Sequence, residues 1–435
     1  MSMQQLRDYQ LAALEGLRSH LRLGTLRLLL VSPTGSGKTT IAAEMIRSAL
    51  ARGGRILFLA HRKELVDQCS TRLDQFGVDH GVIMAGHWRR RFDVPVQVAS
   101  VQTLVQRDEW PRASLIIVDE AHHARARTYG RILEGYPDVP VIGLTATPWR
   151  TDGKGLGEPG PDGKPLFQEV VIATTPRRLM EEGHLVRYTG FSAEIPDLSG
   201  VKTVAGDYDE SQLELAVNTT QIVGGIVERW LERARGLKTV CFAVNVRHSQ
   251  AIVQRFRDAG VAAEHLDGTT PKLEREAILA RLASGRTTVV SNCAVLTEGW
   301  DCPSVTCCIL ARPTQSLGMH LQMVGRVLRP WEGKDFARIH DHAGSLVKPG
   351  WLPDDDHDYS LTGDSDEPPQ ATAIRCESCF VVFRPHEHPR CPDCGWEPPK
   401  AKKVLDEGPE SSGGGGGPPG TEPAEVAGEL IELDD

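Results

Sequence analysis

The stretch LRLLLVSPTGSGKTTIAAEMIRSALARGG (residues 26–54) decides the fold class of this chain. Its apolar run at 26–31 predicts a buried strand, and the stretch from Thr39 to the glycine pair at 53–54 predicts an amphipathic helix. Between them lies the glycine-rich loop SPTGSGKTT at 32–40. A strand that enters a helix through such a loop presents backbone N–H groups and a helix N-terminus to a phosphate group. The stretch therefore predicts a nucleotide-binding α/β domain.

The phosphate loop offers each group that a bound nucleotide needs. Gly35 and Gly37 lack a Cβ, so the backbone can turn its N–H groups toward phosphate oxygens. Lys38 offers a positive charge for the β- and γ-phosphates, and Thr39 offers a hydroxyl for Mg²⁺. The strict pattern has glycine where this chain has Ser32. An ordinary glycine-rich turn would not need Gly-Lys-Thr at the start of the helix, so nucleotide binding is the preferred interpretation.

Apolar runs alternate with amphipathic stretches along most of the chain and form two blocks of similar size. Continuous Val, Ile and Leu runs between helices are typical of parallel sheets covered on both faces. The sequence therefore predicts an α/β protein with two tandem parallel-sheet lobes. The predicted segments are a first lobe (1–165), a connecting segment (166–222), a second lobe (223–350), an acidic linker (351–372), a cysteine-rich module (373–400) and a disordered acidic tail (401–435).

Individual elements follow from the same patterns. In the second lobe, Thr270 is predicted to cap a helix that has Pro271 in its first turn. The strand candidates are 26–31, 55–60, 94–100, 114–120 and 139–146 in the first lobe, and 238–244, 286–292, 305–311 and 337–341 in the second.

The net charge of −9 over 435 residues would by itself disfavour a nucleic-acid partner. The acidic excess lies in two short segments, however, because residues 351–367 carry a net charge of −7 and residues 404–435 carry −9. Residues 1–350 carry a net charge of +5, so a nucleic-acid partner is not excluded. The lack of a long apolar segment or a signal peptide predicts no membrane contact and a cytoplasmic protein whose ten cysteines are reduced.

A pair of carboxylates, Asp119 and Glu120, follows the apolar run SLIIV at 114–118. The carboxyl ends of strands in an open α/β sheet form the edge at which ligands bind. Asp119 suits the coordination of Mg²⁺, and Glu120 suits the orientation or deprotonation of an attacking water. Carboxylates after a strand are common by themselves, but together with an upstream phosphate loop they favour ATP hydrolysis.

Eight motifs occur in the order found in the superfamily 2 DEAD/DEAH-box helicases, which the chain resembles over residues 3–345. The resemblance implies two RecA-like lobes with ATP in the cleft between them. The second-lobe motifs are similar to those of bacterial and phage repair-type members, RadD-like or UvsW-like. The eight motifs are LRDYQ (6–10), PTGSGKT (33–39), FLAHRKELVDQ (58–68), ASVQTL (99–104), DEAH (119–122), GLTATP (143–148), LTEGWD (296–301) and QMVGRVLRP (322–330).

The resemblance also implies roles for individual residues. Arg326 and Arg329 are three residues apart, so on a helix they would share a face and reach the phosphates only when the lobes close. With Lys38, Glu120 and Gln322 they form the catalytic set. The implied nucleotide-binding residues are Arg7, Gln10 (the base-reading candidate), Thr34, Gly35, Ser36, Gly37, Lys38, Thr39, Thr40, Gly299 and Asp301. Thr39 and Asp119 would hold Mg²⁺, and the coupling residues would be His122, Thr145 and Thr147.

Nucleic-acid contacts are implied mainly by motif position, at Arg62, Thr103, Asn245 and Thr297. A further candidate is HWRRRF (87–92), which combines three arginines with two aromatic residues. Such a run can follow phosphates and stack on a base. A solvated loop is its commoner identity, and both interpretations stay open.

The run RCESCFVVFRPHEHPRCPDCGW (375–396) contains two C-x2-C pairs separated by eleven residues. Each pair can grip one side of a tetrahedral Zn²⁺, and Gly395 permits a tight turn after the second pair. A redox pair is the alternative, but a segment too short for its own core favours structural zinc. Basic residues around this ribbon favour nucleic acid slightly, and a protein partner docked by the ribbon or by the acidic tail is the other interpretation. The predicted zinc ligands are Cys376, Cys379, Cys391 and Cys394.

The sequence thus predicts an ATP-dependent nucleic-acid helicase or translocase that acts on DNA in repair, recombination or replication. One alternative is the duplex-translocating motor subunit of a restriction system, although no nuclease constellation follows residue 345. A second is an RNA helicase, because the motor motifs do not report the sugar. A third is a DNA-binding clamp that uses ATP only as a switch, which Glu120, Arg326 and Arg329 argue against.

Overall fold

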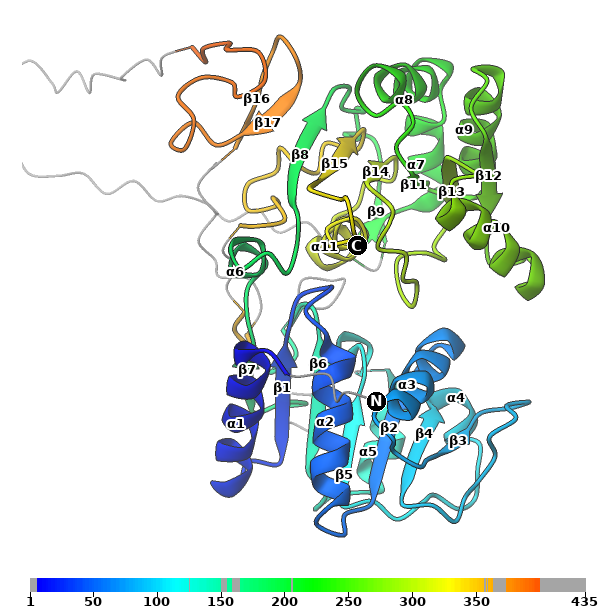
Figure 1. Ribbon diagram of the computed structural model, residues 1–435, viewed down its shortest axis with the longest axis vertical. Helices are drawn as coiled ribbons and strands as arrows, with labels where there is room; N and C mark the ends of the chain where they lie inside the picture. The colour runs from blue at the N-terminus through cyan, green and yellow to red at the C-terminus, as the bar shows by residue number, and fades with distance from the viewer. Residues whose placement is uncertain are drawn as a thin grey trace, which may run out of the picture. The chain divides into compact units, whose positions relative to one another are not determined.

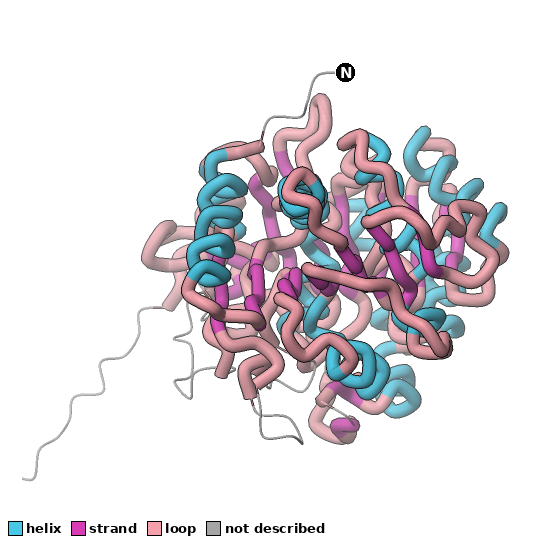
Figure 2. The backbone as a smooth tube through the Cα atoms, turned by 90° about the horizontal axis from the view of Figure 1, so that it is seen from below, coloured by secondary structure: helices cyan, strands magenta, loops and turns pink. Residues whose placement is uncertain are grey.

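The computed structural model describes residues 6–124, 126–149, 155–158, 165–204, 206–355, 357, 359–362 and 373–399. The acidic tail predicted at 401–435 lies outside these residues, as does part of the predicted acidic linker. Within the described ranges, no helix combines the length and the apolar character that a membrane crossing requires. Two large sheets carry the described fold, and Figure 1 and Figure 2 show helices on both faces of the strands.

The first sheet has seven parallel strands in the order β3-β4-β2-β5-β6-β1-β7. The strands are β1 (Arg27–Val31), β2 (Ile56–Ala60), β3 (Gly81–Ile83), β4 (Val96–Ser100), β5 (Leu115–Val118), β6 (Val141–Thr145) and β7 (Glu169–Ile172). The helices around it are α1 (Asp8–Arg22), α2 (Lys38–Leu50), α3 (Lys63–Gln75), α4 (Val101–Leu104), the 3-10 turn η1 (Ala121–His123) and α5 (Arg127–Glu134).

Strand β1 shows why the strands of this sheet are mainly apolar. Successive side chains of a strand point to opposite faces. Leu28 and Leu30 enter the core formed with α1 and α2, whereas Leu29 and Val31 enter the core formed with α5. Both faces are covered at these four buried positions, and all four are apolar, whereas Arg27 at the start of the strand is only half-buried.

The second sheet has eight strands in the order β12-β13-β11-β14-β15-β8-β17-β16. All its pairs are parallel except β8–β17 and β17–β16. The strands are β8 (Arg187–Ser192), β11 (Thr239–Phe242), β12 (Ala263–Leu266), β13 (Val289–Asn292), β14 (Cys307–Leu310), β15 (Phe336–Asp341), β16 (Ile374–Arg375) and β17 (Val381–Phe383). The helices nearby are α6 (Pro176–Glu181), α7 (Glu210–Val217), α8 (Thr220–Arg233), α9 (Val246–Asp258), α10 (Lys272–Ser284) and α11 (Leu317–Gly325), and a small hairpin pairs β9 (Thr203–Val204) with β10 (Asp207–Tyr208).

The structure corrects the boundaries expected for the segment 166–222. Its β7 pairs with β1 and completes the first sheet, whereas its β8 pairs with β15 inside the second sheet. The segment is therefore divided between the lobes rather than lying apart from them. Polar residues in β8, whose sequence is RYTGFS, hide the strand from a search for apolar runs.

The acidic linker and the cysteine-rich module, which the sequence predicted as separate segments, both contact the lobes. Strand β17 of the module pairs antiparallel with β8, so the module extends the second sheet. In the linker, the ring of Tyr359 stacks on Trp149 of the first lobe with 5.7 Å between centroids. The Gly157 N–H donates to Leu361 O at 2.8 Å beside this stack. The linker residues at 359–361 thus pack against the first lobe.

One helix start differs from the prediction. Helix α10 begins at Lys272 with Pro271 at its N-cap position and has no side-chain cap. The hydroxyl of Thr270 instead accepts the N–H of Asp267 and lies 3.3 Å from its carboxylate. Thr270 therefore closes the turn before the helix and does not cap it.

Candidate nucleotide-binding and lobe-coupling site

The phosphate loop joins β1 to α2 at the carboxyl edge of the first sheet. Gly35 and Gly37 have φ values of 87° and 86°, the left-handed region that favours glycine. The Ser36 hydroxyl donates to Pro33 O at 2.6 Å and therefore accepts from the Ser32 hydroxyl, also at 2.6 Å. The serine that replaces the expected glycine thus adds a hydrogen bond that holds the loop in shape.

Lys38 is the first residue of α2, and its side chain folds back over the loop. Its ammonium group donates to Ser32 O at 3.1 Å. Burial lowers the pKa of Lys38, and the carboxylates of Glu120 and Asp119 oppose this shift. An ammonium group withdrawn from water at a helix N-terminus favours the binding of an anion, because a phosphate would supply the negative charge and the hydrogen-bond acceptors that replace the lost water.

The acidic pair follows β5 at the same sheet edge. Burial and the neighbouring Glu120 raise the pKa of Asp119 above its ordinary value. Glu120 has a φ of 46°, which is uncommon for a residue with a side chain, and among the described residues its buried Oε2 has no hydrogen-bond partner, with His122 Nδ1 nearby at 3.5 Å. Strained backbone and an unpartnered buried carboxylate are both costly and cluster at functional sites. They point to a ligand that these carboxylates are built to receive.

The second lobe contributes two guanidinium groups from the opposite side. Helix α11 ends at Gly325, so Arg326 lies at its C-cap and Arg329 in the turn beyond it. The expected shared helix face is therefore absent, although both side chains reach the same place. Arg326 donates to Thr297 O at 3.0 Å and to Trp300 O at 2.6 Å, and Arg329 pairs with Asp301.

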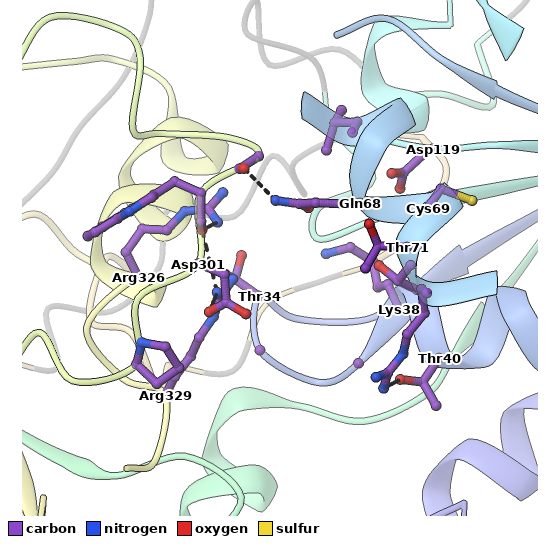
Figure 3. Close-up of a pocket in the computed structure, with 18 of the residues that line it drawn as sticks. Thr34, Lys38, Thr40, Gln68, Cys69, Thr71, Asp119, Asp301, Arg326 and Arg329 are labelled. Carbon is purple, nitrogen blue, oxygen red and sulfur yellow. Dashed lines mark hydrogen bonds and ion pairs between the residues drawn. The ribbon is translucent and has the colours of Figure 1, made fainter. Parts of the chain in front are cut away.

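These groups surround one cleft of about 720 Å³ between the lobes (Figure 3). Its volume suits a nucleoside triphosphate. The cleft brings together most of the residues named from the sequence. They are Arg7, Thr34, Gly35, Gly37, Lys38, Thr39, Thr40, Asp119, Glu120, Gly299, Asp301, Arg326 and Arg329. The residues present fit Mg²⁺ and ATP, since the cleft combines a phosphate loop, the Thr39 hydroxyl, two buried carboxylates and cationic side chains from both lobes.

Three of the residues assigned from the sequence to catalysis or nucleotide binding do not line this cleft. Ser36 and Gln10 support the loop from behind, because the Gln10 amide donates to Ser36 O at 3.0 Å while its Oε1 accepts the Arg7 N–H at 3.0 Å. Gln322 is buried on α11. The cleft also contains residues that the motif search missed, namely His184 and Arg72, whose guanidinium donates to the Thr40 hydroxyl. Both lie outside the quoted motifs, so no local pattern marks them.

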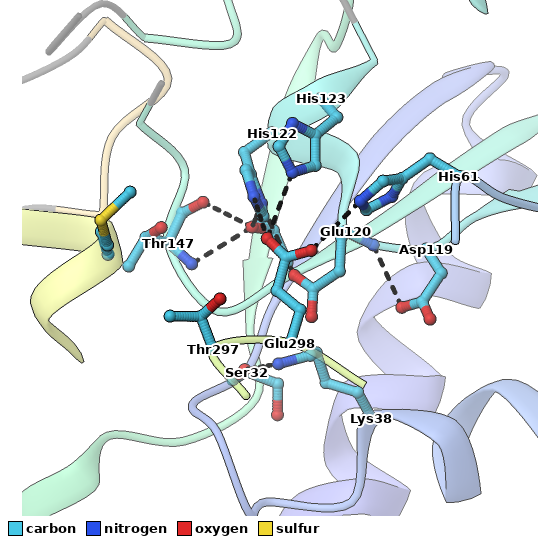
Figure 4. A network of polar contacts seen from close by, with 12 residues as sticks. Ser32, Lys38, His61, Asp119, Glu120, His122, His123, Thr147, Thr297 and Glu298 are labelled. Atoms are coloured by element: carbon cyan, nitrogen blue, oxygen red, sulfur yellow. Dashed lines mark hydrogen bonds and ion pairs between the residues drawn. The ribbon is translucent and has the colours of Figure 1, made fainter. Parts of the chain in front are cut away.

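The coupling residues form a chain of polar contacts beside the cleft. The Nδ1 of His122 lies 3.3 Å from the Thr145 hydroxyl, which donates to Thr147 O at 2.6 Å. The same Nδ1 is 3.5 Å from Glu120 Oε2. Figure 4 shows that this chain continues to Glu298 of the second lobe, a residue that the sequence analysis did not single out.

Two glycines let α11 approach the first lobe closely. A Cβ at Gly325 would lie 2.7 Å from the Cβ of Thr34, in the phosphate loop. A Cβ at Gly318 would lie 2.9 Å from the Thr147 hydroxyl. Distances this short do not occur for real Cβ atoms, so glycine at both positions is required for this closeness of the lobes.

Comparisons with known proteins agree with this two-lobed arrangement. The family described as "Type III restriction enzyme, res subunit" matches residues 3–150, and "Helicase conserved C-terminal domain" matches residues 222–330. A 51.5 kDa protein of a Lactococcus phage is 32% identical over 381 residues, which cover 86% of this chain and 76% of the phage protein. A Saccharomyces cerevisiae protein assigned as the ATP-dependent helicase IRC3 is 33% identical over 363 residues, 78% of this chain and 52% of the yeast protein. The chain belongs to the superfamily 2 helicases.

Solved structures show the same fold for this helicase. The DNA-bound, ATP-dependent type ISP restriction-modification enzyme LlaBIII aligns with a TM-score of 0.58 and 20% identity, over 77% of this chain and 27% of that chain. At this identity the likeness concerns the fold alone. The helicase spans about half the length of the yeast relative and about a quarter of the restriction enzyme.

The four residues named as nucleic-acid contacts have different surroundings in the helicase. Arg62 and Thr103 follow β2 and β4 at the carboxyl edge, where Arg62 pairs with Glu298 at 3.0 Å and the Thr103 hydroxyl accepts the Ala85 N–H at 3.3 Å. Thr297 presents its backbone oxygen to Arg326. Asn245 caps α9 through His248 N–H, and its amide donates to Glu214 at 2.8 Å. The polar atoms of Asn245 are therefore already engaged within the lobe.

The four cysteines of the ribbon converge on one point. The Sγ atoms of Cys376 and Cys394 are 3.5 Å apart, as are those of Cys379 and Cys391, and all four lie within 4.8 Å of one another. Tetrahedral Zn²⁺ with Zn–S bonds of 2.3 Å places thiolates about 3.8 Å apart. The donor set therefore fits zinc. Phe380 follows the first pair with a φ of 65°, as Gly395 follows the second with 78°, so both turns have the same form.

Proposed function

We propose that this helicase is a motor that hydrolyses ATP to move along DNA, in repair, recombination or replication. The observation that carries the proposal is the composition of the cleft. Its phosphate loop and carboxylates come from the first lobe, whereas the guanidinium groups of Arg326 and Arg329 come from the second. Hydrolysis then requires the lobes to close, which links the chemistry to relative motion.

Each part of the cleft has a step in this mechanism. The N–H groups of the loop and Lys38 bind the β- and γ-phosphates, while Thr39 and Asp119 are placed to hold Mg²⁺. When bound, Mg²⁺ neutralises phosphate charge. Glu120 has the free buried oxygen needed to orient a water toward the γ-phosphate. Arg326 and Arg329 stabilise the charge that develops on the phosphates. A clamp that uses ATP only as a switch would need neither the water-orienting glutamate nor the arginines.

The carboxyl edge of the first sheet offers the nucleic-acid interface. Thr103 follows β4, and the loop after β3 lies beside it. This loop presents Trp88 with 79% of its surface exposed. It is held in place by the Arg89–Asp74 pair and by Arg91, whose guanidinium donates to Asp79 at 2.7 Å. An exposed aromatic side chain on a well-anchored loop favours base stacking over the solvated-loop interpretation of 87–92.

DNA is preferred over RNA because of the restriction-enzyme relatives. The family model that matches the first lobe is described as the res subunit of a type III restriction enzyme, and a relative from Sulfurisphaera tokodaii that is 24% identical over 362 residues is described as a DNA 3'-5' translocase. These relatives also support the second candidate, a motor that translocates on duplex DNA without separating its strands.

The test is steady-state ATP hydrolysis with single-stranded DNA, forked DNA, duplex DNA and RNA as separate stimulants. We expect stimulation by DNA that is abolished in Lys38→Ala and Glu120→Gln. Equal turnover with and without every nucleic acid would contradict the motor. Stimulation by duplex without strand separation on the fork would favour the translocase candidate, and stimulation by RNA alone would favour an RNA helicase.

We also propose that the ribbon holds structural zinc in the reducing cytoplasm, where thiolates persist. Within the described residues its basic side chains are largely engaged: Arg384 pairs with Asp354 and Asp355, and Arg375 donates to Ala193 O. The ribbon therefore serves mainly to complete the second lobe rather than to bind DNA. Metal analysis should find about one zinc per chain, lost in Cys391→Ser and retained in the control Cys302→Ser. Equal zinc in both variants would refute the site.

A further inference from the structure

Glu298 lies on the loop that connects β13 to β14 in the second lobe, yet its side chain is surrounded by the first lobe (Figure 4). Only 7% of its side-chain surface is exposed. A buried carboxylate is costly unless it is paired and hydrogen-bonded. The residues that pair with Glu298 therefore indicate its role.

All four partners of this carboxylate come from the first lobe. On one oxygen, His61 Nε2 lies at 3.1 Å and Arg62 Nε at 3.0 Å. On the other, His123 Nε2 lies at 3.3 Å and His122 Nε2 at 3.8 Å. These partners come from two motifs, one after β2 and one after β5. One carboxylate of the second lobe thus joins two strand ends of the first.

The charge balance of this cluster favours an ionised glutamate. Burial alone would raise the pKa of Glu298, but its contacts with the three imidazoles, two of them hydrogen bonds, and the guanidinium charge hold it well below its ordinary value. Two of the histidines and the glutamate have the spacing of metal ligands. Arg62 pairs with the same oxygen as His61, however, and a guanidinium there repels a cation. The cluster is therefore a contact between lobes and not a metal site.

His122 connects this contact to the chemistry. Its Nε2 faces Glu298, while its Nδ1 faces Glu120 Oε2 at 3.5 Å and the Thr145 hydroxyl at 3.3 Å. Glu298 thereby fixes the orientation of the ring that adjoins the water-orienting glutamate. The preceding residue, Thr297, accepts Arg326 through its carbonyl at 3.0 Å. Two adjacent residues of this loop therefore contact both sides of the cleft: Thr297 holds Arg326 of the second lobe, and Glu298 contacts His122 of the first.

We propose that Glu298 is a positioning residue that makes hydrolysis depend on lobe closure, because it orients His122 beside Glu120 only when Arg326 has arrived. The inference rests on the proposed ATPase function and adds the route by which closure is sensed. Without the Glu298 carboxylate, the lobes can still bring Arg326 to the cleft, but the His122 ring loses the partner that defines its orientation.

The test compares Glu298→Gln, which keeps size and removes charge, with Arg275→Ala. Arg275 forms another ion pair between the lobes, 3.1 Å from Glu64, and does not line the cleft. Loss of Glu298 should lower the DNA-stimulated kcat about tenfold, within the usual range of coupling between sites, and leave KM for ATP nearly unchanged. Arg275→Ala should keep wild-type kcat. Equal losses in both variants would mean that Glu298 only holds the lobes together.

A double-mutant cycle with His122→Ala identifies the route. If Glu298 acts through His122, the double variant should be no slower than His122→Ala alone, since the second change removes nothing further. Additive losses would overturn the proposal, as would a raised KM for ATP with unchanged kcat. Thermal unfolding of each variant serves as the control that the second lobe remains folded. If no nucleic acid changes the rate of ATP hydrolysis by the wild type, the proposed motor function is contradicted. The double-mutant cycle can then be measured on hydrolysis without nucleic acid, where it still tests the role of Glu298.

Discussion

The two halves of the ATP cleft differ in how their cations are held. In the first lobe, Lys38 donates to the backbone of its own loop, and the loop is closed by the Ser32–Ser36 hydrogen bond. In the second lobe, Arg326 donates to two carbonyl oxygens and Arg329 pairs with Asp301. The first half is complete within one lobe, whereas the second becomes part of the cleft only through contact between lobes. We therefore expect the first half to determine ATP affinity and the second half to determine the rate of hydrolysis.

The largest expected effect separates these two roles. Arg326→Ala should lower kcat about 10³-fold, because an arginine finger contributes at least this much to phosphoryl transfer, and should leave nucleotide affinity within a few-fold of wild type. Lys38→Ala should lose both affinity and turnover. Steady-state hydrolysis and titration with a fluorescent ATP analogue measure the two quantities. The exposed Arg286 provides the control, as Arg286→Ala should change neither. If Arg326→Ala loses affinity as severely as Lys38→Ala, the division of roles is wrong.

A second prediction concerns the junction of the halves. In Gly325→Ala the new Cβ would meet Thr34, so the second lobe must retreat, and a misplacement of about 1 Å can cost about 10² in rate. The matched control is Gly224→Ala in α8, where nothing lies within 4 Å of the added Cβ. ATP affinity should survive in both variants. Wild-type kcat for Gly325→Ala would show that the lobes do not approach this closely during turnover.

The smallest effect concerns the loop itself. Ser32→Gly restores the strict pattern but removes the hydrogen bond to Ser36, which contributes about 1 kcal/mol. We expect KM for ATP to rise about fivefold with kcat unchanged. Ser32→Ala should behave in the same way, because it also lacks the hydroxyl. If only the glycine variant is affected, backbone freedom rather than the hydrogen bond explains the loop.

Much of the first lobe was predictable because its elements are local. The 26–54 stretch places a strand, its loop and its helix in consecutive residues, and β2, β4, β5 and β6 each appear as one apolar run. The phosphate loop and the acidic pair follow directly from these strands, since parallel strands end at a common edge. The cleft residues that were named from these motifs lie together for this reason.

The unpredicted features depend on contacts between distant segments. Strand β8 carries arginine, tyrosine and glycine, and only its pairing with β15 and β17 makes it a strand. A glutamate in a loop is expected to be exposed to solvent, and Glu298 is buried only because the two lobes meet around it. A signal did exist, because His61 directly follows the apolar strand β2, and His122 and His123 lie shortly after the apolar strand β5. These histidines could be recognised as partners of Glu298 only once the position of the second lobe was known.

The place of β8 in its sheet affects the order in which the chain can fold during synthesis. β8 is the first strand of its sheet to leave the ribosome, while its neighbours β15 and β17 are among the last. Until they emerge, β8 presents two unpaired edges, which invite association with other chains. The second lobe thus reaches its full sheet only after the cysteine ribbon is made. A nascent chain halted before residue 381 would carry a finished first lobe and an open second one, and would be the form most in need of a chaperone.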